Sequence, residues 1–334
     1  MPPSFMNAYF QSVILNAAQA KNLFEIEIIQ SLWSGYGQII RYGLEQSQSS
    51  HKSVVVKHIQ LPTQNKHPRG WNTNLSHQRK LKSYRVETCW YQYWNERCSN
   101  ACKTPECLAV EFKDDEIIIV LQDLNQTGFP NLKSTASIAE IQTCLSWLAN
   151  FHATFMNEQP VNLWEVGTYW HLATRPDELK SLNDHSLRNA AKLIDQKLQD
   201  SPFQTIVHGD AKLANFCFSS NGKSVAAVDF QYVGGGCGIK DVAYFIGSCL
   251  DENQCEQLES KLLDYYFQAL NKALMVQQKS IDPMAVEQDW RSLYPVAWTD
   301  FHRFLKGWSP GHWKIHSYSE RLAREVVAQF STSS

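Results

Sequence analysis

Three oxygen-bearing side chains lie at spacings that suit the transfer of a phosphoryl group. Asn215 comes five residues after Asp210, and Asp229 ends a short apolar run further along the chain. In kinase-type active sites an Asp, an Asn and a second Asp in this order act as the catalytic base and two metal ligands. Amide and carboxylate oxygens are ligands that Mg²⁺ prefers. We therefore expect Asp210 to take the proton of an attacking hydroxyl, with Asn215 and Asp229 as the metal ligands.

His208 stands two residues before the expected base. Its two ring nitrogens can bind backbone groups or exchange protons with a substrate. Because the base is already supplied by Asp210, we expect His208 to orient the backbone around Asp229 and not to react.

A cation for the nucleotide phosphates is expected from the first part of the chain. Lys57 follows the apolar run Val54–Val56 and would point from a strand into a cleft, while Glu87 lies in a helical pattern. An ion pair between them would hold the lysine against the α- and β-phosphates. Isolated residues of these types are usually surface groups. The prediction rests on their order before the segment that carries Asp210.

Two further segments suggest contacts with a nucleotide. Gly35 and Gly37 lie between two strand-like runs, where backbone N–H groups could cover phosphates. Two glycines between strands also form an ordinary hairpin turn. Gln122, Asp123 and Leu124 lie at the end of the last strand-like run of this part, and their backbone could hydrogen-bond the edge of an adenine ring.

These residues require a strand-rich part followed by a helix-rich part. Apolar spacing predicts helices over 5–20 and about 77–97, and β-branched runs predict strands over 25–33, 38–44, 53–59, 108–112 and 117–122. Helices are then expected over 138–156, 186–199, 241–249, 252–276, 285–305 and 319–330, with short strands within 206–230. We expect an α+β fold with a sheet lobe over 1–123 and a helical lobe over 124–334. Ligands would bind in the cleft between them.

The composition argues against several other classes of partner. The 334 residues are 43% hydrophobic and 19% charged, and the formal net charge is −2 at pH 7. A near-neutral chain lacks the basic surface that nucleic acids require. No apolar run has the length of a membrane span or the layout of a secretion signal. We expect a cytoplasmic protein without nucleic-acid or membrane partners, and nothing in the sequence indicates an oligomeric state.

Several of these motifs together resemble one group of kinases, the aminoglycoside phosphotransferase and choline kinase-like superfamily. Within it the chain is most similar to the ecdysteroid kinase-like (CHK kinase-like) branch. The motifs are Ser83-Tyr-x-x-Glu87, Leu121-Gln-Asp-Leu124, His208-Gly-Asp-x-Lys-x-x-Asn215, Val228-Asp-Phe-Gln231 and Lys240-Asp241. The resemblance spans about residues 30–310 and implies a protein-kinase-like two-lobed fold, with ATP as donor, Mg²⁺ as metal and a hydroxylated small molecule as acceptor.

The resemblance also implies roles for individual residues. Asp210 matches the catalytic base of the family, and Lys57 with Glu87 matches its phosphate-positioning pair. Lys212 would approach the transferred phosphate, where a cation offsets the charge that develops in the transition state. Asp241 would cap the next helix and brace the catalytic loop.

Two departures from protein kinases are informative. Gly209 stands where protein kinases have an arginine beside the base, so no arginine is available to receive a phosphorylated loop. Gln231 replaces the glycine of Asp-Phe-Gly, and only residues 232–240 separate it from the next expected helix. Without a long activation segment, loop phosphorylation is not expected and a small acceptor is favoured over a protein.

The acceptor itself is only loosely predicted. Aromatic residues recur over 298–313 and would either form a cage for a choline-like cation, line a cleft for an apolar alcohol, or pack the core. No acidic cluster lies in 290–316 to receive an aminoglycoside, and the family resemblance favours the apolar alcohol. Two other functions fit parts of the pattern: a nucleotide-binding pseudoenzyme that acts as an interaction module, and a protein kinase.

Overall fold

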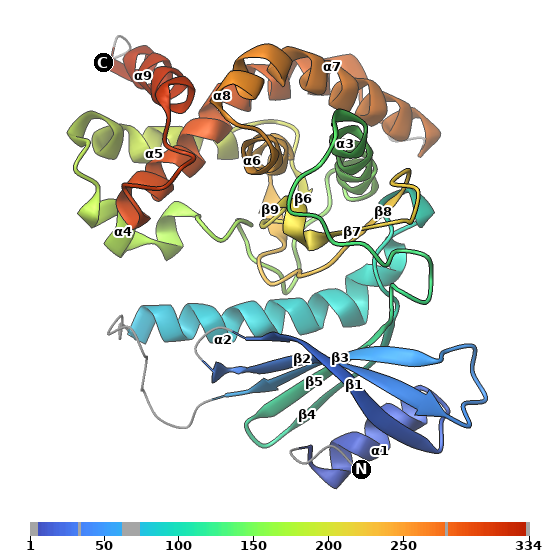
Figure 1. The fold of residues 1–334 in the computed structure, drawn as a ribbon. Helices are drawn as coiled ribbons and strands as arrows, with labels where there is room; N and C mark the ends of the chain where they lie inside the picture. The colour runs from blue at the N-terminus through green and yellow to red at the C-terminus, as the bar shows by residue number, and fades with distance from the viewer. Residues whose placement is uncertain (1–5, 33–34, 62–73, 278–279, 332–334) are drawn as a thin grey trace.

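The computed structural model describes residues 6–32, 35–61, 74–277 and 280–331. A smaller lobe is built on an antiparallel sheet, and a larger lobe consists mainly of helices (Figure 1). Helix α2 (Asn74–Cys89) lies between the sheet and the helical lobe (Figure 1). This is the α+β, two-lobed arrangement expected from the sequence.

Five antiparallel strands form the sheet in the order β1-β2-β3-β5-β4. They are β1 (Asn22–Ser31), β2 (Gly37–Glu45), β3 (Ser53–Gln60), β4 (Cys107–Lys113) and β5 (Glu116–Gln122). Side chains of a strand alternate between its two faces. On β5, Ile118 and Val120 pack with Phe10 of helix α1 (Ala8–Ala17), whereas Ile117 and Ile119 belong to the core on the side of α2. The same alternation places Lys57 of β3 on the side that faces the helical lobe.

Helix α2 connects the two lobes through its aromatic C-terminal end. It continues as a π-helical turn (Trp90–Trp94) and a 3-10 turn (Asn95–Arg97), which together extend to the end of the helix expected over 77–97. Trp90 stacks on Phe230 with ring centroids 4.4 Å apart. Phe230 directly follows Asp229, so this contact fixes the predicted metal ligand relative to the helix that carries Glu87.

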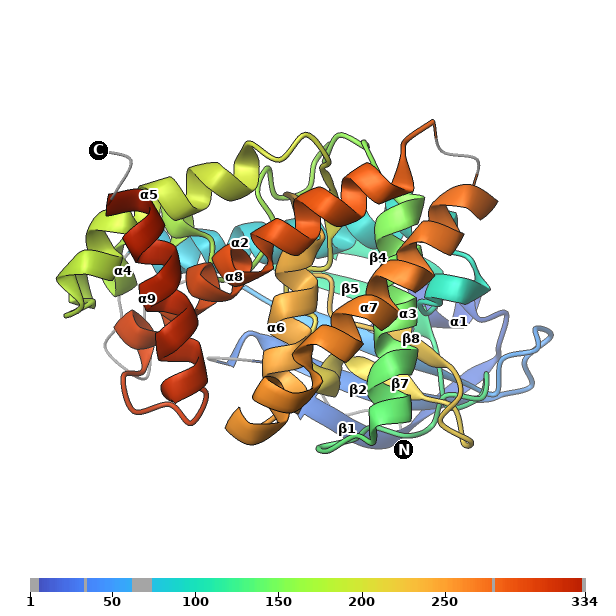
Figure 2. The same ribbon diagram turned by 90° about the horizontal axis from the view of Figure 1, so that it is seen from above.

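Long helices form the core of the larger lobe. They are α3 (Ile138–Thr154), α5 (His185–Gln199), α6 (Ile239–Cys249), α7 (Glu252–Val276), α8 (Pro283–Trp308) and α9 (Ser317–Ser331), with the short α4 (Pro176–Ser181) before α5. Helix α3 packs along α7, and α8 runs across α5, α6 and α9 (Figure 2). Two small ladders, β6 (Thr205–Val207) with β9 (Gly234–Gly236) and β7 (Phe216–Phe218) with β8 (Val225–Ala227), frame the segment that carries Asp210 and Asn215.

The expected elements are present with shifted ends, and two were missed. The ends expected at residues 5 and 33 lie outside the described residues, and α6 begins at Ile239 and not at Asp241. Helix α4 and strand β9 were not predicted. A run of three glycines carries no strand signal, but a Cβ on Gly234 would overlap the carbonyl oxygen of Trp164. The close backbone approach explains the glycines.

Among the helices of the described ranges, none combines the length and hydrophobicity needed to cross a lipid bilayer.

Candidate active site

A cavity of about 1140 Å³ opens between the two lobes and collects most of the predicted residues. Those in its lining are Lys57, Glu87, Gln122, Asp123, Leu124, Asp210, Lys212, Asn215 and Asp229. Gly35 and Gly37 are not among the lining residues; Leu32 and Tyr36 border the cavity from the same connection. Residues far apart in the sequence therefore converge on one site, as a cleft-bound ligand requires.

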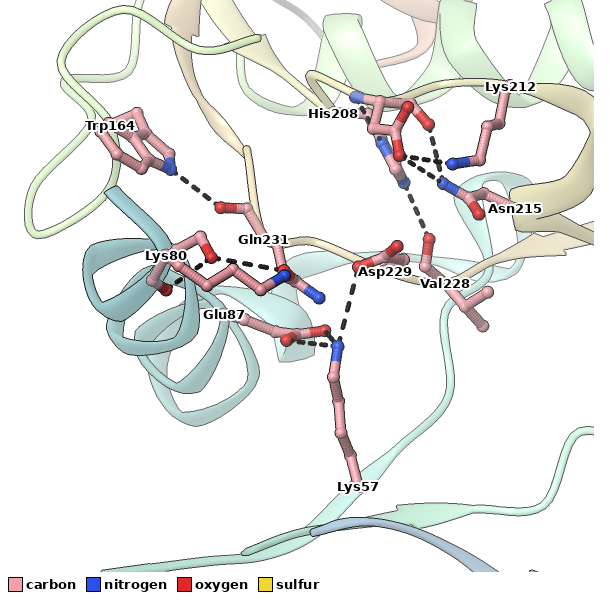
Figure 3. Close-up of polar contacts among 12 residues, drawn as sticks. Lys57, Lys80, Glu87, Trp164, His208, Lys212, Asn215, Val228, Asp229 and Gln231 are labelled. Atoms are coloured by element: carbon pink, nitrogen blue, oxygen red, sulfur yellow. Dashed lines mark hydrogen bonds and ion pairs between the residues drawn. The ribbon is translucent and has the colours of Figure 1, made fainter. Parts of the chain in front are cut away.

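Lys57 on β3 and Glu87 on α2 form the ion pair expected from the sequence. The Nζ of Lys57 lies 2.8 Å and 2.7 Å from the two carboxylate oxygens of Glu87, and both side chains are buried (Figure 3). The same nitrogen lies 3.7 Å from Oδ1 of Asp229. Burial favours the neutral amine, yet the two carboxylates raise the pKa of Lys57 above its ordinary value. Lys57 is therefore a fixed cation between α2 and the predicted metal ligand.

Asp229 keeps an oxygen available for a cation. Its backbone has a φ of +69°, in the left-handed region that few residues other than glycine adopt. Its Oδ1 is buried and accepts no hydrogen bond from the described residues. Burial favours the protonated acid, but the charges of Lys57 and other nearby lysines hold the pKa of Asp229 below its ordinary value. The side chain is thus an anion with an unused acceptor.

Asp210 is held by donors on both of its carboxylate oxygens. Oδ2 accepts from Lys212 Nζ at 2.9 Å and from Asn215 Nδ2 at 3.2 Å, and Oδ1 accepts from the hydroxyl of Tyr244 at 2.9 Å. Burial raises the pKa of Asp210, although the charge of Lys212 opposes this shift. A buried carboxylate with a raised pKa is a stronger base than an exposed one, which suits proton acceptance from a hydroxyl.

His208 links the base to the segment that carries Asp229. The backbone N–H of Asp210 donates to His208 Nδ1 at 3.2 Å, so the proton of the neutral ring lies on Nε2, which donates to the carbonyl of Val228 at 3.1 Å. The ring therefore fixes two backbone segments. This contact matches the structural role expected of His208.

Asp241 braces the same loop from α6. Its carboxylate accepts the backbone N–H groups of His208 at 2.6 Å and of Gly209 at 3.0 Å, and lies 3.2 Å from Nε2 of His152. Asp241 is fully buried, so these contacts satisfy a charge that would otherwise be costly to bury. The bracing expected from the sequence is present, but the N-cap of α6 is Gly238.

The glycine of the His-Gly-Asp segment is required by its surroundings. Gly209 has a φ of +80°, and a Cβ there would overlap the carbonyl oxygen of Tyr232 and lie 2.8 Å from the backbone nitrogen of Thr168. Only glycine adopts this conformation without strain and leaves room for the neighbouring chain. The position that holds arginine in protein kinases is therefore closed to any side chain here.

Lys80 is a cation in the site that sequence reasoning missed. It lines the cavity from α2, and its Nζ donates to Oε1 of Gln231 at 2.9 Å (Figure 3). The same nitrogen lies 4.7 Å from the ring centre of Tyr84. Burial and the charge of Lys57 lower the pKa of Lys80 to about 8. Lys80 precedes Glu87 by two helical turns, which puts both on one face of the helix. That spacing was the available signal.

Gln231 occupies the glycine position of Asp-Phe-Gly and connects the two lobes. Its Oε1 also accepts from Ser83 Oγ at 3.3 Å, and its backbone carbonyl accepts from Trp164 Nε1 at 2.8 Å. Because Ser83 lies on α2 and Trp164 in the helical lobe, a glycine at this position would lose the side-chain half of the link.

The side chain of Asp123, which directly follows β5, is occupied by hydrogen bonds to other residues of the sheet lobe. Its Oδ2 accepts from Arg41 Nε at 3.0 Å and from Ser53 Oγ at 2.6 Å, and the side chain is buried. These contacts tie β2 and β3 to the segment between the lobes. Any contact of Asp123 with an adenine ring would therefore fall to its backbone, the kind of contact expected from the sequence.

The aromatic residues of the helical lobe divide between the core and the cavity. Trp298 and Trp290 are buried in the hydrophobic core, and Trp313 is exposed. The cavity is lined instead by Tyr169, Tyr232, Tyr244, Phe304 and Trp308. Within residues 298–313, the aromatic side chains that line the cavity are therefore Phe304 and Trp308, from the last turns of α8.

The donor set around Asp210 fits Mg²⁺. Asn215 donates its amide hydrogens to the carbonyl and the carboxylate of Asp210, at 2.8 Å and 3.2 Å, so its carbonyl oxygen stays available as an acceptor. Together with the unused Oδ1 of Asp229, this gives the amide and carboxylate oxygens that a hard cation prefers. Both residues line the same cavity.

Comparisons with known proteins agree with the fold and identify the family. No curated protein sequence matches the chain significantly. An amicoumacin kinase in complex with AMP-PNP, Ca²⁺ and Ami is similar in structure, with a TM-score of 0.54 and 13% identity over 97% of this chain and 93% of that chain. A microcompartment-associated aminopropanol kinase gives a TM-score of 0.51 and 13% identity over 96% of this chain and 94% of that one. At such low identity these likenesses show the shared kinase-like fold.

The family is shown by the sequence itself. The profile of the ecdysteroid kinase-like family matches residues 40–162 and 155–278, which together cover most of the 334 residues. The protein therefore belongs to the ecdysteroid kinase-like family of small-molecule kinases.

Proposed function

We propose that this protein transfers the γ-phosphoryl group of ATP to a hydroxyl group of a small molecule, in the presence of Mg²⁺. The observation that carries the proposal is the convergence of Asp210, Asn215 and Asp229 with the Lys57–Glu87 pair on one cavity. The sheet lobe, residues 1–123, would hold the nucleotide and the helical lobe, residues 124–334, the acceptor. The amicoumacin kinase of similar fold is complexed with AMP-PNP, which supports ATP as the donor.

The proposed reaction is a direct displacement at phosphorus. The acceptor oxygen forms a bond to the γ-phosphorus while the bond to the oxygen that bridges the β- and γ-phosphates breaks, and ADP leaves with that oxygen and its electron pair. The hydroxyl proton passes to the carboxylate of Asp210. Lys212, 2.9 Å from that carboxylate, offsets the negative charge that spreads over the transferred group.

The remaining charged groups position the nucleotide. Lys57, fixed by Glu87, would contact the inner phosphates, as this pair does in kinases. Asn215 and Asp229 would hold Mg²⁺, which when bound neutralises the charge of the phosphate oxygens. The backbone at Gly35 and Gly37, on either side of the lining residue Tyr36, would cover the phosphates, and that of Gln122 to Leu124 would meet the adenine.

Lys80 adds a second cation to this set. Its hydrogen-bonding partner among the described residues is the neutral amide of Gln231, and Lys57 and Asp229 act on it electrostatically. A buried cation beside another cation is costly unless an anion joins them. We therefore assign Lys80 to the triphosphate, as a residue that positions it.

The test is the Asp210→Asn variant with ATP, Mg²⁺ and a panel of small alcohols. Loss of the base is expected to lower kcat by about a hundredfold or more, while binding of AMP-PNP is retained. The matched control is Asp115→Asn, because Asp115 is exposed in the turn between β4 and β5. A fully active Asp210→Asn enzyme would rule out the assignment of the base.

Two outcomes of the same panel point to other functions. Binding of AMP-PNP without transfer to any alcohol would favour an interaction module that only binds nucleotide. Transfer of label to proteins of a lysate would favour a protein kinase. The structure argues against that function, because α6 begins at Ile239, ten residues after Asp229, and leaves no space for a long activation segment.

A further inference from the structure

A continuous series of aromatic rings leads away from the catalytic base. Tyr244, which donates to Asp210, contacts Tyr169 with ring centroids 5.7 Å apart. Tyr169 contacts Phe304 at 5.5 Å, and Phe304 stacks on Trp308 at 5.9 Å. All four rings line the cavity. An acceptor whose hydroxyl reaches Asp210 would lie along these rings, so they define the acceptor side of the site.

An arginine of the protein, Arg175, already lies over two of these rings. The guanidinium of Arg175 lies 5.9 Å from the ring centre of Tyr169 and 5.2 Å from that of Phe304. Its Nε donates to the carbonyl of Tyr169 at 2.6 Å, and one terminal nitrogen lies 3.1 Å from Oε1 of Glu178. The position at which an aromatic cage would receive a ligand cation is therefore filled by Arg175.

A second arginine reaches the same end of the cavity from the other lobe. Arg79 on α2 donates to the carbonyl of Thr174 at 2.7 Å and to Ser76 Oγ at 3.2 Å, and it lines the cavity as Arg175 does. Burial, and then the like charge of Arg175, lower the pKa of Arg79. Tyr232 lies within electrostatic range of both arginines and of Asp210. The two guanidinium groups thus stand near each other on the acceptor side.

No carboxylate in the described lining of the cavity pairs with Arg79 or Arg175. Those in the described lining are Glu27, Glu87, Asp123, Asp210 and Asp229. Glu27 and Asp123 pair with Arg41, Glu87 pairs with Lys57, and the remaining two belong to the transfer site. Near the arginines, Glu178 pairs with Arg175 and Asp177 is exposed, but neither lines the cavity. The surface offered to the acceptor is aromatic and basic.

We propose that the acceptor is an alcohol with a flat or apolar skeleton that also bears an anionic group, bound by Arg79 and Arg175. This inference rests on the proposed phosphotransferase function and names the class of its second substrate. Guanidinium groups bind carboxylate, sulfate and phosphate through paired N–H donors. An ammonium group would be repelled at the same place. The site thereby differs from one built for an amino alcohol or a quaternary ammonium acceptor.

The test uses matched acceptors that differ only in charge. Arylalkanoates that carry a 4-hydroxymethyl group and one to four methylene groups are compared with the corresponding amides and amines, with ATP and Mg²⁺. We expect kcat/KM to be roughly tenfold higher for the best acid than for its amide, as a charge-assisted hydrogen bond supplies, and lowest for the amine. An amide or amine that equals or exceeds the acid would overturn the proposal.

Variants then locate the preference. Arg79→Met and Arg175→Met should each reduce the acid-to-amide ratio of kcat/KM by about tenfold, and Arg175→Lys should retain part of it. The control is Arg85→Met, on the same helix as Arg79 but exposed, which should keep the wild-type ratio. Because two arginines are substituted separately, the test still works if one variant fails to fold. An unchanged acid-to-amide ratio in every arginine variant that folds would contradict the assignment.

Binding separates this inference from the proposed function. Calorimetry on the complex with AMP-PNP gives the affinity of the same acids, amides and amines without any reaction. Transfer to alcohols with a preference for amines would leave the phosphotransferase function intact and reject the anionic site. Arginine-dependent binding of the acids without any transfer would support the site and reject the function. If the acids bind no better than the amides and amines, or do not bind, and no transfer occurs, the anionic site is rejected.

Discussion

Tyr244 donates its hydroxyl hydrogen to Oδ1 of Asp210 at 2.9 Å and lies within the aromatic series on the acceptor side. Each carboxylate oxygen can accept two hydrogen bonds, and Oδ2 already accepts from both Lys212 and Asn215. The acceptor position left on Oδ1, beside the Tyr244 hydroxyl, is therefore the one we expect an acceptor hydroxyl to meet.

The Tyr244→Phe variant should lower kcat by about tenfold, because a hydrogen bond to a charged group contributes about 1.5 to 3 kcal/mol. The ring packing is retained, so the Tm should change little. Steady-state kinetics with saturating ATP and a melting curve test this. A fall in Tm that matches the fall in activity would contradict a specific effect on the base.

The Asp241→Asn variant should destabilise the protein by about 2 to 4 kcal/mol. The carboxylate accepts two backbone N–H groups, from His208 and Gly209. An asparagine would direct its NH₂ group at one of them and leave a buried donor unsatisfied. Urea denaturation measures the change, with Asp264→Asn as control because Asp264 is exposed and pairs with Arg291 on the surface. A change below about 0.5 kcal/mol would show that the brace is not needed.

The residues that the sequence assigned to phosphoryl transfer lie around one cavity, and they could be assigned because they are local or ordered along the chain. Asp210 and Asn215 share one short segment, and Lys57 and Glu87 each follow from the pattern of the element that carries them. Asp229 could be placed because it ends an apolar run. The two-lobed fold followed from the change from strand to helix periodicity near residue 124.

The acceptor side could not be predicted in the same way. Arg175 precedes the short helix α4, and its contact with Phe304 depends on the path of the chain across the helical lobe. Spacing alone also did not separate Trp298, which packs in the core, from Trp308, which lines the cavity. Both lie on α8, Trp298 within the helix and Trp308 at its C-terminal end.

The Gly209→Ala variant should be destabilised by about 3 kcal/mol or more. A methyl group there would overlap the Tyr232 carbonyl and would also force alanine into a positive φ of +80°. Thermal unfolding and expression level measure the effect.

Gly128→Ala is the matched control for this prediction. Gly128 also has a positive φ, +95°, but a Cβ there would have no atom within 4 Å. Its substitution should therefore cost only the conformational part, about 1 kcal/mol. Equal losses for the two variants would show that the close approach of Tyr232 has no effect.

The last prediction concerns Lys80, whose pKa is lowered to about 8 by burial and by Lys57. Between pH 8 and its ordinary pKa of 10.5, the unfolded chain binds a proton at this residue that the folded protein does not, so stability should rise with pH across this range. Below pH 8 the full penalty is present, about 3 kcal/mol for a shift from 10.5 to about 8. At pH 7, Lys80→Met should therefore raise the Tm of the ligand-free protein.

The same substitution should weaken nucleotide binding. If Lys80 contacts the triphosphate, Lys80→Met should raise the Kd for ATP by about tenfold or more, whereas Lys80→Arg, which keeps the charge, should preserve most of the affinity. The affinity of the wild-type protein should decline above about pH 8 as Lys80 loses its proton, and that of Lys80→Arg should not. Calorimetric titrations at pH 7 and pH 9 test both statements. If Lys80 had only a structural role, its substitution would lower the Tm and leave the Kd for ATP unchanged. A lysine that binds the triphosphate instead destabilises the ligand-free protein by its charge and strengthens the binding of ATP.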